Sequence, residues 1–450
     1  MRQFYSLVFR LFLLCIFFAG QAMGQDISQQ IVPGRFNGKA AQQQPYVILI
    51  SADGFRYDYA TRYNARHLLD LSSVGVTAKS MEPAFPSLTF PNHYTLITGL
   101  YPGHHGLVDN SFWDPRRQSR YSMYNKKTVG DGSWYGGIPL WVLAEQQQMV
   151  TASFYWVGSE ADIKGVRPTY YYNYNEKISM DERIAVVKNW LQLPADKRPH
   201  LITFYMPEVD HEGHDHGPYS KEVEEAVHFV DASVAKLQDM LDSLKLPVNV
   251  VFLSDHGMAQ VDTVNTLPLP VVDTTRLNMQ PSDVLIHIFA RDTTDKEYIT
   301  QAYAKLKAEA KDYDVYLNAQ LPGRWNYGGV DDRYKRAGDI VVVPRFPKIF
   351  AWGNKRIYPG RHGFDPRKVK DMHATFMAWG PAFKQGKQIG SFPNVQVYGL
   401  VAGLLNLDIN GPTDTNRKLF RKTVRKTVGR GPYDPEPSTL YDKLLLPEPK

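Results

Sequence analysis

Six side chains that can bind a metal ion are spread over four segments of this 450-residue chain. All are carboxylates or imidazoles, and they lie at or near the ends of short apolar runs. Six such ligands with one hydroxyl suit two zinc ions that keep open coordination positions. Two metal ions about 3.5–4 Å apart can hold the attacking and leaving oxygens of an in-line displacement at phosphorus. The six residues are Asp53, Asp210, His214, Asp255, His256 and His362.

Each of these residues has an ordinary alternative role when it is considered alone. An aspartate after a strand, such as Asp53, is commonly a helix cap. His362 could be a surface histidine with hydrogen bonds of its own, and His211 and His216 flank His214 and could replace it as ligands. The combination is more specific than its members, because all six positions lie where strands of one sheet would end.

The apolar runs before the candidate ligands have the composition of buried strands. They are residues 46–51 (YVILIS), 201–205 (LITFY) and 248–253 (VNVVFL), and residues 221–244 between them show helical spacing. Strands that alternate with helices predict an α/β fold with a mainly parallel sheet flanked by helices. Active sites of such folds gather beyond the carboxyl ends of the strands, so we expect the six ligands to converge there.

We interpret residues 25–450 as a single catalytic domain that carries a small α+β insertion at about 280–350. The pattern within the insertion predicts a strand, a helix and two more strands. These elements are expected at 284–289, 295–311, 314–321 and 339–346. The Pro-rich tail after Arg430 is expected to be a strap on the surface.

Residues 1–24 have the pattern of a secretory signal peptide. Arg2 and Arg10 form a basic region, residues 11–20 are apolar, and residues 22–24 (AMG) form a small-x-small cleavage site. The alternative is an uncleaved anchor, but the apolar run is shorter than the roughly 20 residues of a bilayer span. We therefore expect an exported protein, periplasmic or secreted, with no membrane span after cleavage.

The cysteine content and the charge limit the possible chemistry and partners. The only cysteine, Cys15, lies in the signal segment, so the mature chain cannot form disulfides and must build any metal site from other side chains. The formal charge of +6 falls to +4 without Arg2 and Arg10, and no polybasic run is present. This indicates no nucleic-acid-binding surface. The oligomeric state is left open.

Six stretches resemble the nucleotide pyrophosphatase/phosphodiesterase family of the alkaline phosphatase superfamily, in a bacterial-type form. The stretch around the threonine at position 89 is the most specific. In chain order they are SADGFR, FPSLTFPNHYTLITGLYPGHHGLVDN, WVGSEADIKG, FYMPEVDHEGH, FLSDHGM and GRHGF, and the similarity runs from residue 47 to about 383. The resemblance implies an alkaline-phosphatase-like core and two bound Zn²⁺ ions.

The resemblance also implies a role for each matching residue. One zinc would be bound by Asp53, Asp255 and His256, and the other by Asp210, His214 and His362. Thr89 would be the nucleophile in contact with the first zinc, and Asn110 would donate to a non-bridging phosphoryl oxygen.

Elementary chemistry supports these roles for Thr89 and Asn110. Zinc lowers the pKa of a bound hydroxyl, so attack by Thr89 would give a phospho-threonine intermediate. Asn110 and a backbone N–H near Thr89 would stabilise the equatorial oxygens. The alternatives are a helix cap for Thr89 and an ordinary turn for Asn110. His93 and His373 are expected to support the site without binding metal.

Three aromatic residues bear on the substrate. Phe90 follows the nucleophile, and Tyr174 and Tyr205 match family positions that form a slot for a nucleobase. Alternatively, Tyr174 packs with the tyrosines at 170–172. The monoesterases of the superfamily have an arginine beside the nucleophile. In this chain Phe90 follows Thr89 and supplies no charge, and this difference favours diesters over monoesters. We therefore expect hydrolysis of nucleotide diester and pyrophosphate bonds to nucleoside 5′-monophosphates.

Two other functions stay open at this stage. A phosphodiesterase for choline-type lipid headgroups could use the same two metals, but it needs an acidic or aromatic cage that the sequence does not reveal. A catalytically inactive metal-binding surface protein is the second alternative, and the presence of Thr89 with all six ligands opposes it.

Overall fold

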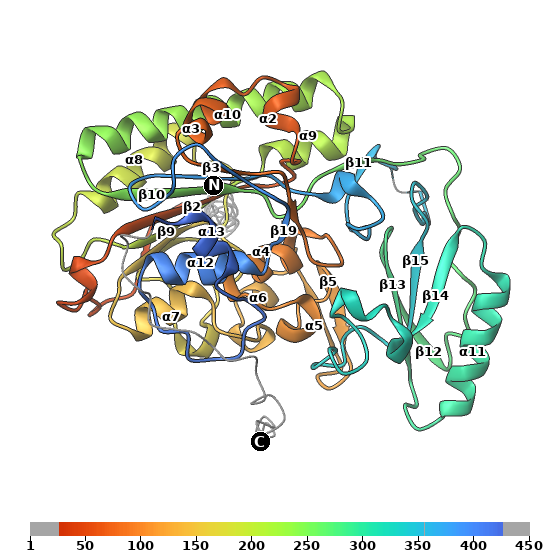
Figure 1. The fold of residues 1–450 in the computed structure, drawn as a ribbon. Helices are drawn as coiled ribbons and strands as arrows, with labels where there is room; N and C mark the ends of the chain where they lie inside the picture. Colours follow the sequence, from red (N-terminus) through yellow and green to blue (C-terminus); the bar gives the residue numbers. More distant parts are fainter. Residues whose placement is uncertain (1–26, 355, 426–450) are drawn as a thin grey trace, which may run out of the picture.

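A nine-stranded sheet forms the centre of the computed structural model, which describes residues 27–354 and 356–425 (Figure 1). The expected signal peptide and the tail after Arg430 lie outside the described residues. The strands occur in the order β1-β8-β7-β9-β2-β10-β17-β3-β18. Their bounds are Gln30–Ile31, Tyr170–Tyr172, Thr151–Phe154, Leu201–Met206, Tyr46–Ala52, Val248–Leu253, Phe376–Trp379, Val76–Ala78 and Lys387–Ile389.

The central strands β8, β7, β9, β2 and β10 are parallel to one another. In this register Ser51 of β2 lies between Tyr205 of β9 and Leu253 of β10. The carboxyl ends of these three strands therefore lie side by side, as the apolar runs in the sequence predict. The prediction of an α/β fold with a mainly parallel sheet flanked by helices is confirmed.

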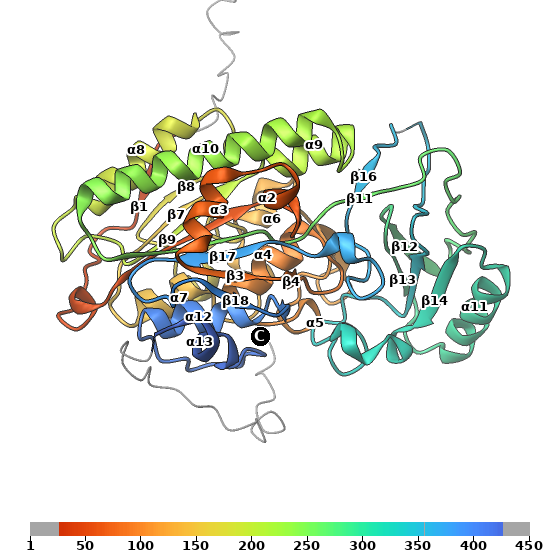
Figure 2. The same cartoon turned by 45° about the horizontal axis from the view of Figure 1, so that its top comes forward.

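Helices cover both faces of the sheet (Figures 1 and 2). One face carries α3 (Arg66–Ser73), α8 (Met180–Leu191) and α10 (Lys221–Leu244), and the other carries α4 (Thr89–Thr98), α7 (Leu140–Gln146) and α12 (Gln396–Leu404). Alternate residues of β2 pack into separate apolar clusters, Val47 and Leu49 on one side and Ile48 and Ile50 on the other. No helix among the described residues is long and apolar enough to cross a membrane.

A separate four-stranded antiparallel sheet lies beside the main one (Figure 1). It contains β12 (Leu277–Pro281), β13 (Ile286–Ala290), β15 (Ile340–Pro344) and β14 (Tyr313–Leu317), with α11 (Lys296–Glu309) packed against its own apolar cluster. Its strands and helix occur in the order expected from the sequence, and β12 was not anticipated. The division of the chain into domains stays a proposal.

Candidate metal and nucleophile site

One cluster of candidate ligands lies where β2 and β10 end. Asp53, Asp255 and His256 are buried, and one ligand atom from each lies within 4.8 Å of the others. His256 Nε2 is 2.9 Å from Asp255 Oδ2 and 3.5 Å from Asp53 Oδ1. His256 Nδ1 donates to the carbonyl oxygen of Gly257, which leaves Nε2 directed at the two carboxylates.

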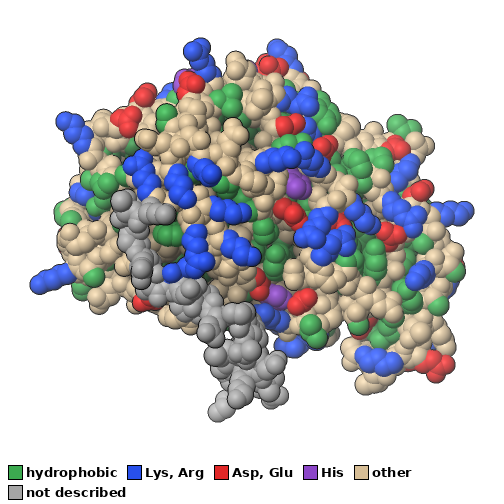
Figure 3. Space-filling model, in the orientation of Figure 1, with side chains coloured by type: hydrophobic (Ala, Val, Ile, Leu, Met, Phe, Trp, Pro, Cys, Tyr) green, Lys and Arg blue, Asp and Glu red, His purple; other side chains and the backbone are tan. Residues whose placement is uncertain are grey.

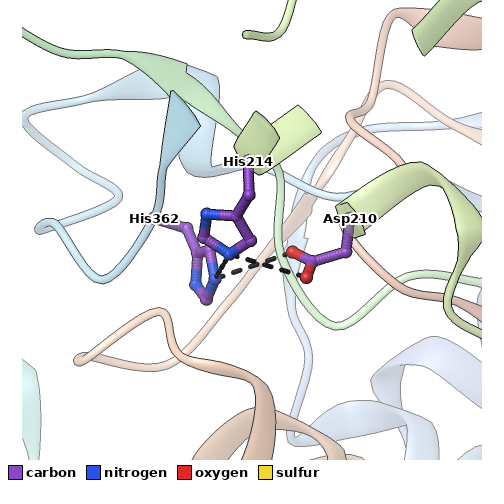
Figure 4. Close-up of side chains that lie close together, drawn as sticks. All are labelled: Asp210, His214 and His362. Carbon is purple, nitrogen blue, oxygen red and sulfur yellow. Dashed lines mark hydrogen bonds and ion pairs between the residues drawn. The ribbon is translucent and has the colours of Figure 1, made fainter. Parts of the chain in front are cut away.

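A second cluster is formed by Asp210, His214 and His362 (Figure 4). Helix α9 (Glu208–His216) places Asp210 and His214 one turn apart, and His362 directly follows β16 (Gly360–Arg361). The Nδ1 atoms of His214 and His362 donate to the carbonyls of Gly360 and Ser87, both at 2.9 Å. Their Nε2 atoms then face each other at 3.0 Å as two acceptors, an arrangement that a cation between them would stabilise.

The buried oxygens in both clusters fit a divalent cation. Asp53 Oδ1, Asp210 Oδ1 and Asp255 Oδ2 have no hydrogen-bond partner, although burying such an atom unpaired is costly. Burial, together with the charges of Asp255 and Asp210, raises the pKa of Asp53 well above its usual value. Burial opposes ionisation of Asp255 too, but His256 and His93 hold its pKa well below the usual range. Buried carboxylates paired with imidazoles are the donor set that zinc takes.

Two glycines allow the ligand segments to approach one another. Gly54 has a φ of +67°, and a Cβ there would lie 2.9 Å from the Cα of Asp210. A Cβ on Gly360 would lie 1.9 Å from the carbonyl oxygen of Gly213. A side chain at either position would therefore push apart the segments that carry the ligands.

The two clusters are adjacent. The rings of His256 and His362, one from each cluster, stack with centroids 3.6 Å apart and an interplanar angle of 15°. The short strands β11 (Ala259–Gln260) and β16, which lie beside these histidines in sequence, pair with each other in antiparallel register. This pairing holds the ligand of one cluster against the ligand of the other.

Thr89 is the first residue of α4, and its hydroxyl faces the first cluster. Thr89 Oγ1 lies 3.1 Å from His256 Nε2. The N-cap of the helix is Leu88, and no side chain caps this helix end, so the helix-cap alternative for Thr89 is wrong. The hydroxyl of a side chain that is only 9% exposed thus points at candidate metal ligands.

Asn110 lies close to the same helix end. Its Oδ1 accepts a hydrogen bond from the backbone N–H of Phe90 at 2.9 Å. This N–H, which directly follows Thr89, is therefore engaged by the protein instead of being free for a phosphoryl oxygen. The contact also orients the amide, so that Nδ2 is the donor left to face a ligand.

The aromatic residues expected at the substrate slot are partly brought together. Tyr174 is 40% exposed, and its ring centroid lies 6.0 Å from that of Tyr205. Tyr170 and Tyr172 pack against Trp190, and Tyr174 packs at 5.2 Å against Tyr155, so the packing alternative for Tyr174 stays open. The partly buried ring of Phe90 packs 6.2 Å from Tyr121, and its role opposite the tyrosines stays a prediction.

The histidines that compete with His214 lie outside both clusters. His211 and His216 lie beside surface glutamates, and His216 Nε2 is 3.4 Å from Glu212 Oε2. His373 contacts Ser80 through Nδ1 at 2.8 Å. On the molecular face in Figure 3, acidic and basic side chains surround a histidine where the large and small sheets meet.

Sequence reasoning missed two contacts that support the candidate ligands. Tyr205 donates its hydroxyl hydrogen to Asp53 Oδ2 at 2.6 Å. Arg361 donates to Asp283 Oδ2 at 2.5 Å and to the Gly360 carbonyl that also accepts from His214. The first contact follows from the strand register, which places Tyr205 beside Ser51, whereas the second depends on the approach of a loop from the small sheet and leaves no signal in the sequence.

Comparison with known proteins shows the family of the chain. The profile of the family described as "Type I phosphodiesterase / nucleotide pyrophosphatase" matches residues 47–365. The chain is 33% identical over 407 residues to ectonucleotide pyrophosphatase/phosphodiesterase family member 1 of Mus musculus, covering 86% of this chain and 43% of that protein. It is 32% identical over 381 residues to venom phosphodiesterase 2 of Crotalus adamanteus, covering 82% of this chain and 46% of that protein. The chain thus spans less than half the length of these relatives.

Solved structures show the same fold. Murine ectonucleotide pyrophosphatase/phosphodiesterase 5 superposes with a TM-score of 0.77 at 28% identity, covering 84% of this chain and 100% of that one. An inactive threonine-to-alanine variant of the murine protein, in complex with AMP, matches with the same values.

The fold is therefore alkaline-phosphatase-like, and two candidate metal-binding clusters lie at the carboxyl edge of its sheet. The chain belongs to the type I phosphodiesterase/nucleotide pyrophosphatase family.

Proposed function

We propose that this protein is an exported, zinc-dependent hydrolase of nucleotide phosphodiester and pyrophosphate bonds that releases nucleoside 5′-monophosphates. The observation that carries the proposal is the position of Thr89 Oγ1, 3.1 Å from Nε2 of His256 in the first cluster, whose ring stacks on His362 of the second. Membership of a phosphodiesterase and nucleotide pyrophosphatase family supports it. Names of relatives that describe ectoenzymes and venom enzymes support export.

The proposed reaction uses Thr89 as the nucleophile. Its oxygen attacks phosphorus, the bond to the leaving oxygen breaks, and a phospho-threonine forms that water then hydrolyses. Bound zinc would supply Lewis acidity that lowers the pKa of the Thr89 hydroxyl and neutralises charge on the reacting oxygens. Asn110 Nδ2, oriented by the Phe90 N–H, donates to a non-bridging oxygen on which charge develops. The inactive threonine variant of a structural relative supports a threonine nucleophile.

The ligands divide between the two metals as the clusters divide. Asp53, Asp255 and His256 would hold the zinc next to Thr89. The second zinc would be held by Asp210, His214 and His362. Tyr205 leaves Asp53 Oδ1 free for this purpose because it occupies Oδ2.

The substrate is a small-molecule nucleotide in this proposal. The rings of Tyr174 and Tyr205 supply flat apolar surface on which any base can stack. Phe90 follows the nucleophile where a monoesterase would need a positive charge, so a diester is preferred over a monoester. AMP, bound by a structural relative, is a nucleoside 5′-monophosphate of the kind proposed as product.

One set of assays tests the proposal against its alternatives. The mature protein is tested with a chromogenic nucleotidyl ester, a chromogenic phosphocholine ester and a chromogenic monoester, with zinc and with a chelator. We expect the nucleotidyl ester to be cleaved fastest, chelation to stop the reaction, and Thr89→Ala to lower kcat at least about 10³-fold while retaining zinc.

Each alternative has its own signature in this set. Fastest cleavage of the phosphocholine ester identifies a headgroup phosphodiesterase, and failure to turn over any ester with zinc bound identifies an inactive metal-binding protein. A faster monoester rate, or activity that survives Thr89→Ala, contradicts the proposed mechanism.

A further inference from the structure

His93 lies one helical turn after the nucleophile and is completely buried. Its Nδ1 atom is 3.0 Å from the carbonyl oxygen of Thr89, and its Nε2 atom is 2.9 Å from Ser51 Oγ. The same Nδ1 atom lies 3.2 Å from Asp255 Oδ2, a candidate metal ligand.

These contacts determine which nitrogen of His93 carries the hydrogen. The carbonyl of Thr89 can only accept, so Nδ1 is protonated and donates to it. Nε2 then accepts from the hydroxyl of Ser51. Asp255 Oδ2, which has no hydrogen bond of good geometry, lies within the electrostatic reach of the Nδ1–H group.

The imidazole therefore connects the three segments from which the first cluster and the nucleophile come. Ser51 lies on β2, two residues before Asp53, which directly follows the strand. Thr89 begins α4, and Asp255 follows β10.

Two aromatic rings pack edge to face with the ring of His93. The centroids of Tyr205 and Trp156 each lie 5.2 Å from its centroid. Trp156 Nε1 also donates to the carbonyl oxygen of His93 at 3.1 Å. A ring fixed in this way can hold its own partners at set distances.

We propose that His93 is a positioning residue that sets the separation between the Thr89 hydroxyl and the metal at the first cluster. Its Nδ1–H holds the Thr89 carbonyl while attracting the Asp255 carboxylate, and Nε2 accepts from the Ser51 hydroxyl. The inference rests on the proposed function of the same site. It predicts that the donor at Nδ1 matters more than the bulk of the ring.

Two amide variants separate the donor from the bulk. The amide nitrogen of His93→Asn replaces Nδ1, whereas that of His93→Gln reaches the Nε2 position and leaves the Thr89 carbonyl without its side-chain donor. We expect His93→Gln to lower both zinc affinity at the first cluster and kcat by about 10- to 100-fold, the usual range for groups that orient metal ligands. We expect His93→Asn to stay within about 5-fold of the wild type in both.

The matched control is His200→Gln, which replaces another buried histidine whose ring stacks on Tyr46 and contacts the Pro45 carbonyl. Zinc affinity is measured by competition with a chromogenic chelator, and the site is monitored by the absorption spectrum of the Co²⁺-substituted protein. Melting of the metal-free proteins shows whether each variant folds. The control should match the wild type in zinc affinity, spectrum and kcat.

The outcomes distinguish this inference from the proposed function. A wild type that binds no zinc or cleaves no ester refutes the proposed function itself. If the wild type binds zinc and cleaves the ester, unchanged zinc affinity and kcat in His93→Gln overturn the role of His93. Equal losses in folded His93→Asn and folded His93→Gln overturn it too. If His93→Gln does not fold, a loss of more than 10-fold in zinc affinity for folded His93→Asn overturns it equally.

Discussion

The hydroxyl of Tyr205 donates to Asp53 Oδ2 at 2.6 Å, so a ring of the expected nucleobase slot is bonded directly to a candidate metal ligand. The same ring lies 6.0 Å from Tyr174, whose hydroxyl bonds Glu176 and touches no candidate ligand. The two tyrosines are therefore not equivalent, because Tyr205 donates to a candidate metal ligand whereas Tyr174 donates to Glu176.

Variants of the two tyrosines should have different kinetic effects. Tyr174→Ala removes stacking worth about 1–3 kcal/mol, so KM for a nucleotidyl ester should rise about 5- to 150-fold with little change in kcat. Tyr205→Phe keeps the ring but removes the bond to Asp53, so zinc affinity should fall about 10-fold with KM nearly unchanged. Steady-state kinetics with a nucleotidyl ester and with a diester that lacks a base check both. A KM increase for the base-free diester in Tyr174→Ala would contradict the stacking role.

Replacing Asn110 should affect catalysis more than binding. Asn110→Ala removes the donor that the Phe90 N–H orients, and loss of one such donor costs about 10²- to 10³-fold in kcat. Asn110→Asp keeps the acceptor for the Phe90 N–H but adds negative charge near the phosphate, so it should be at least as slow. Single-turnover rates of the two variants make the comparison. Equal rates for the wild type and Asn110→Ala would assign Asn110 to the turn alone.

Asp53→Asn should have opposite effects on stability with and without zinc. Burial and the charges of Asp255 and Asp210 raise the pKa of Asp53, so its folded-state pKa exceeds the unfolded value of 3.8 and stability is lost as pH rises above 3.8. The metal-free variant should therefore melt at a higher temperature than the metal-free wild type at pH 8. Zinc at 1,000 times its Kd stabilises a folded protein by about 4 kcal/mol. The variant should lose the part of this stabilisation that comes from zinc bound at the first cluster. Melting scans with and without chelator measure both effects.

His287 offers a test of acid sensitivity at a residue outside the two candidate metal clusters. It is buried in the small sheet and bonds Tyr327 Oη through Nε2, and burial lowers its pKa from 6.5 to about 3. Because the folded pKa is depressed, the unfolded state binds the extra proton below pH 6.5, and stability falls as pH drops from 6.5 towards 3. His287→Gln keeps a donor for Tyr327 but does not titrate. At pH 5 the wild type should lose about 2 kcal/mol relative to this variant, measured by urea unfolding at pH 5 and pH 7.5. An equal loss in both proteins would show that His287 already titrates freely in the fold.

The residues of the site that could be predicted from the sequence are those that follow the ends of predicted strands. Asp53, Asp210 and Asp255 follow runs whose parallel pairing was evident from composition, so their convergence follows from the fold class. The contact between Arg361 and Asp283 could not be anticipated, since it joins segments that no local pattern relates. The tautomer of His93 and the orientation of Asn110 depend on single hydrogen-bond partners, which spacing alone does not specify.

The pairing of β11 with β16 has a consequence for how this chain can diverge. The chain leaves the paired ends at Gln260 and returns to them at Gly360, and these two residues are register partners. Everything between them, including the small sheet, is an excursion that starts and ends at one point beside His256 and His362. Parts of this excursion nevertheless pack into the main core: Trp325 stacks on Phe85 at 3.8 Å, and the buried Arg336 donates to Asp114. The excursion can therefore change its sequence only where it does not contact the core or the paired ends. We expect related chains, and designed chimeras, to vary most at its exposed positions and to keep Trp325, Arg336 and Asp283 together with the four residues of the paired ends.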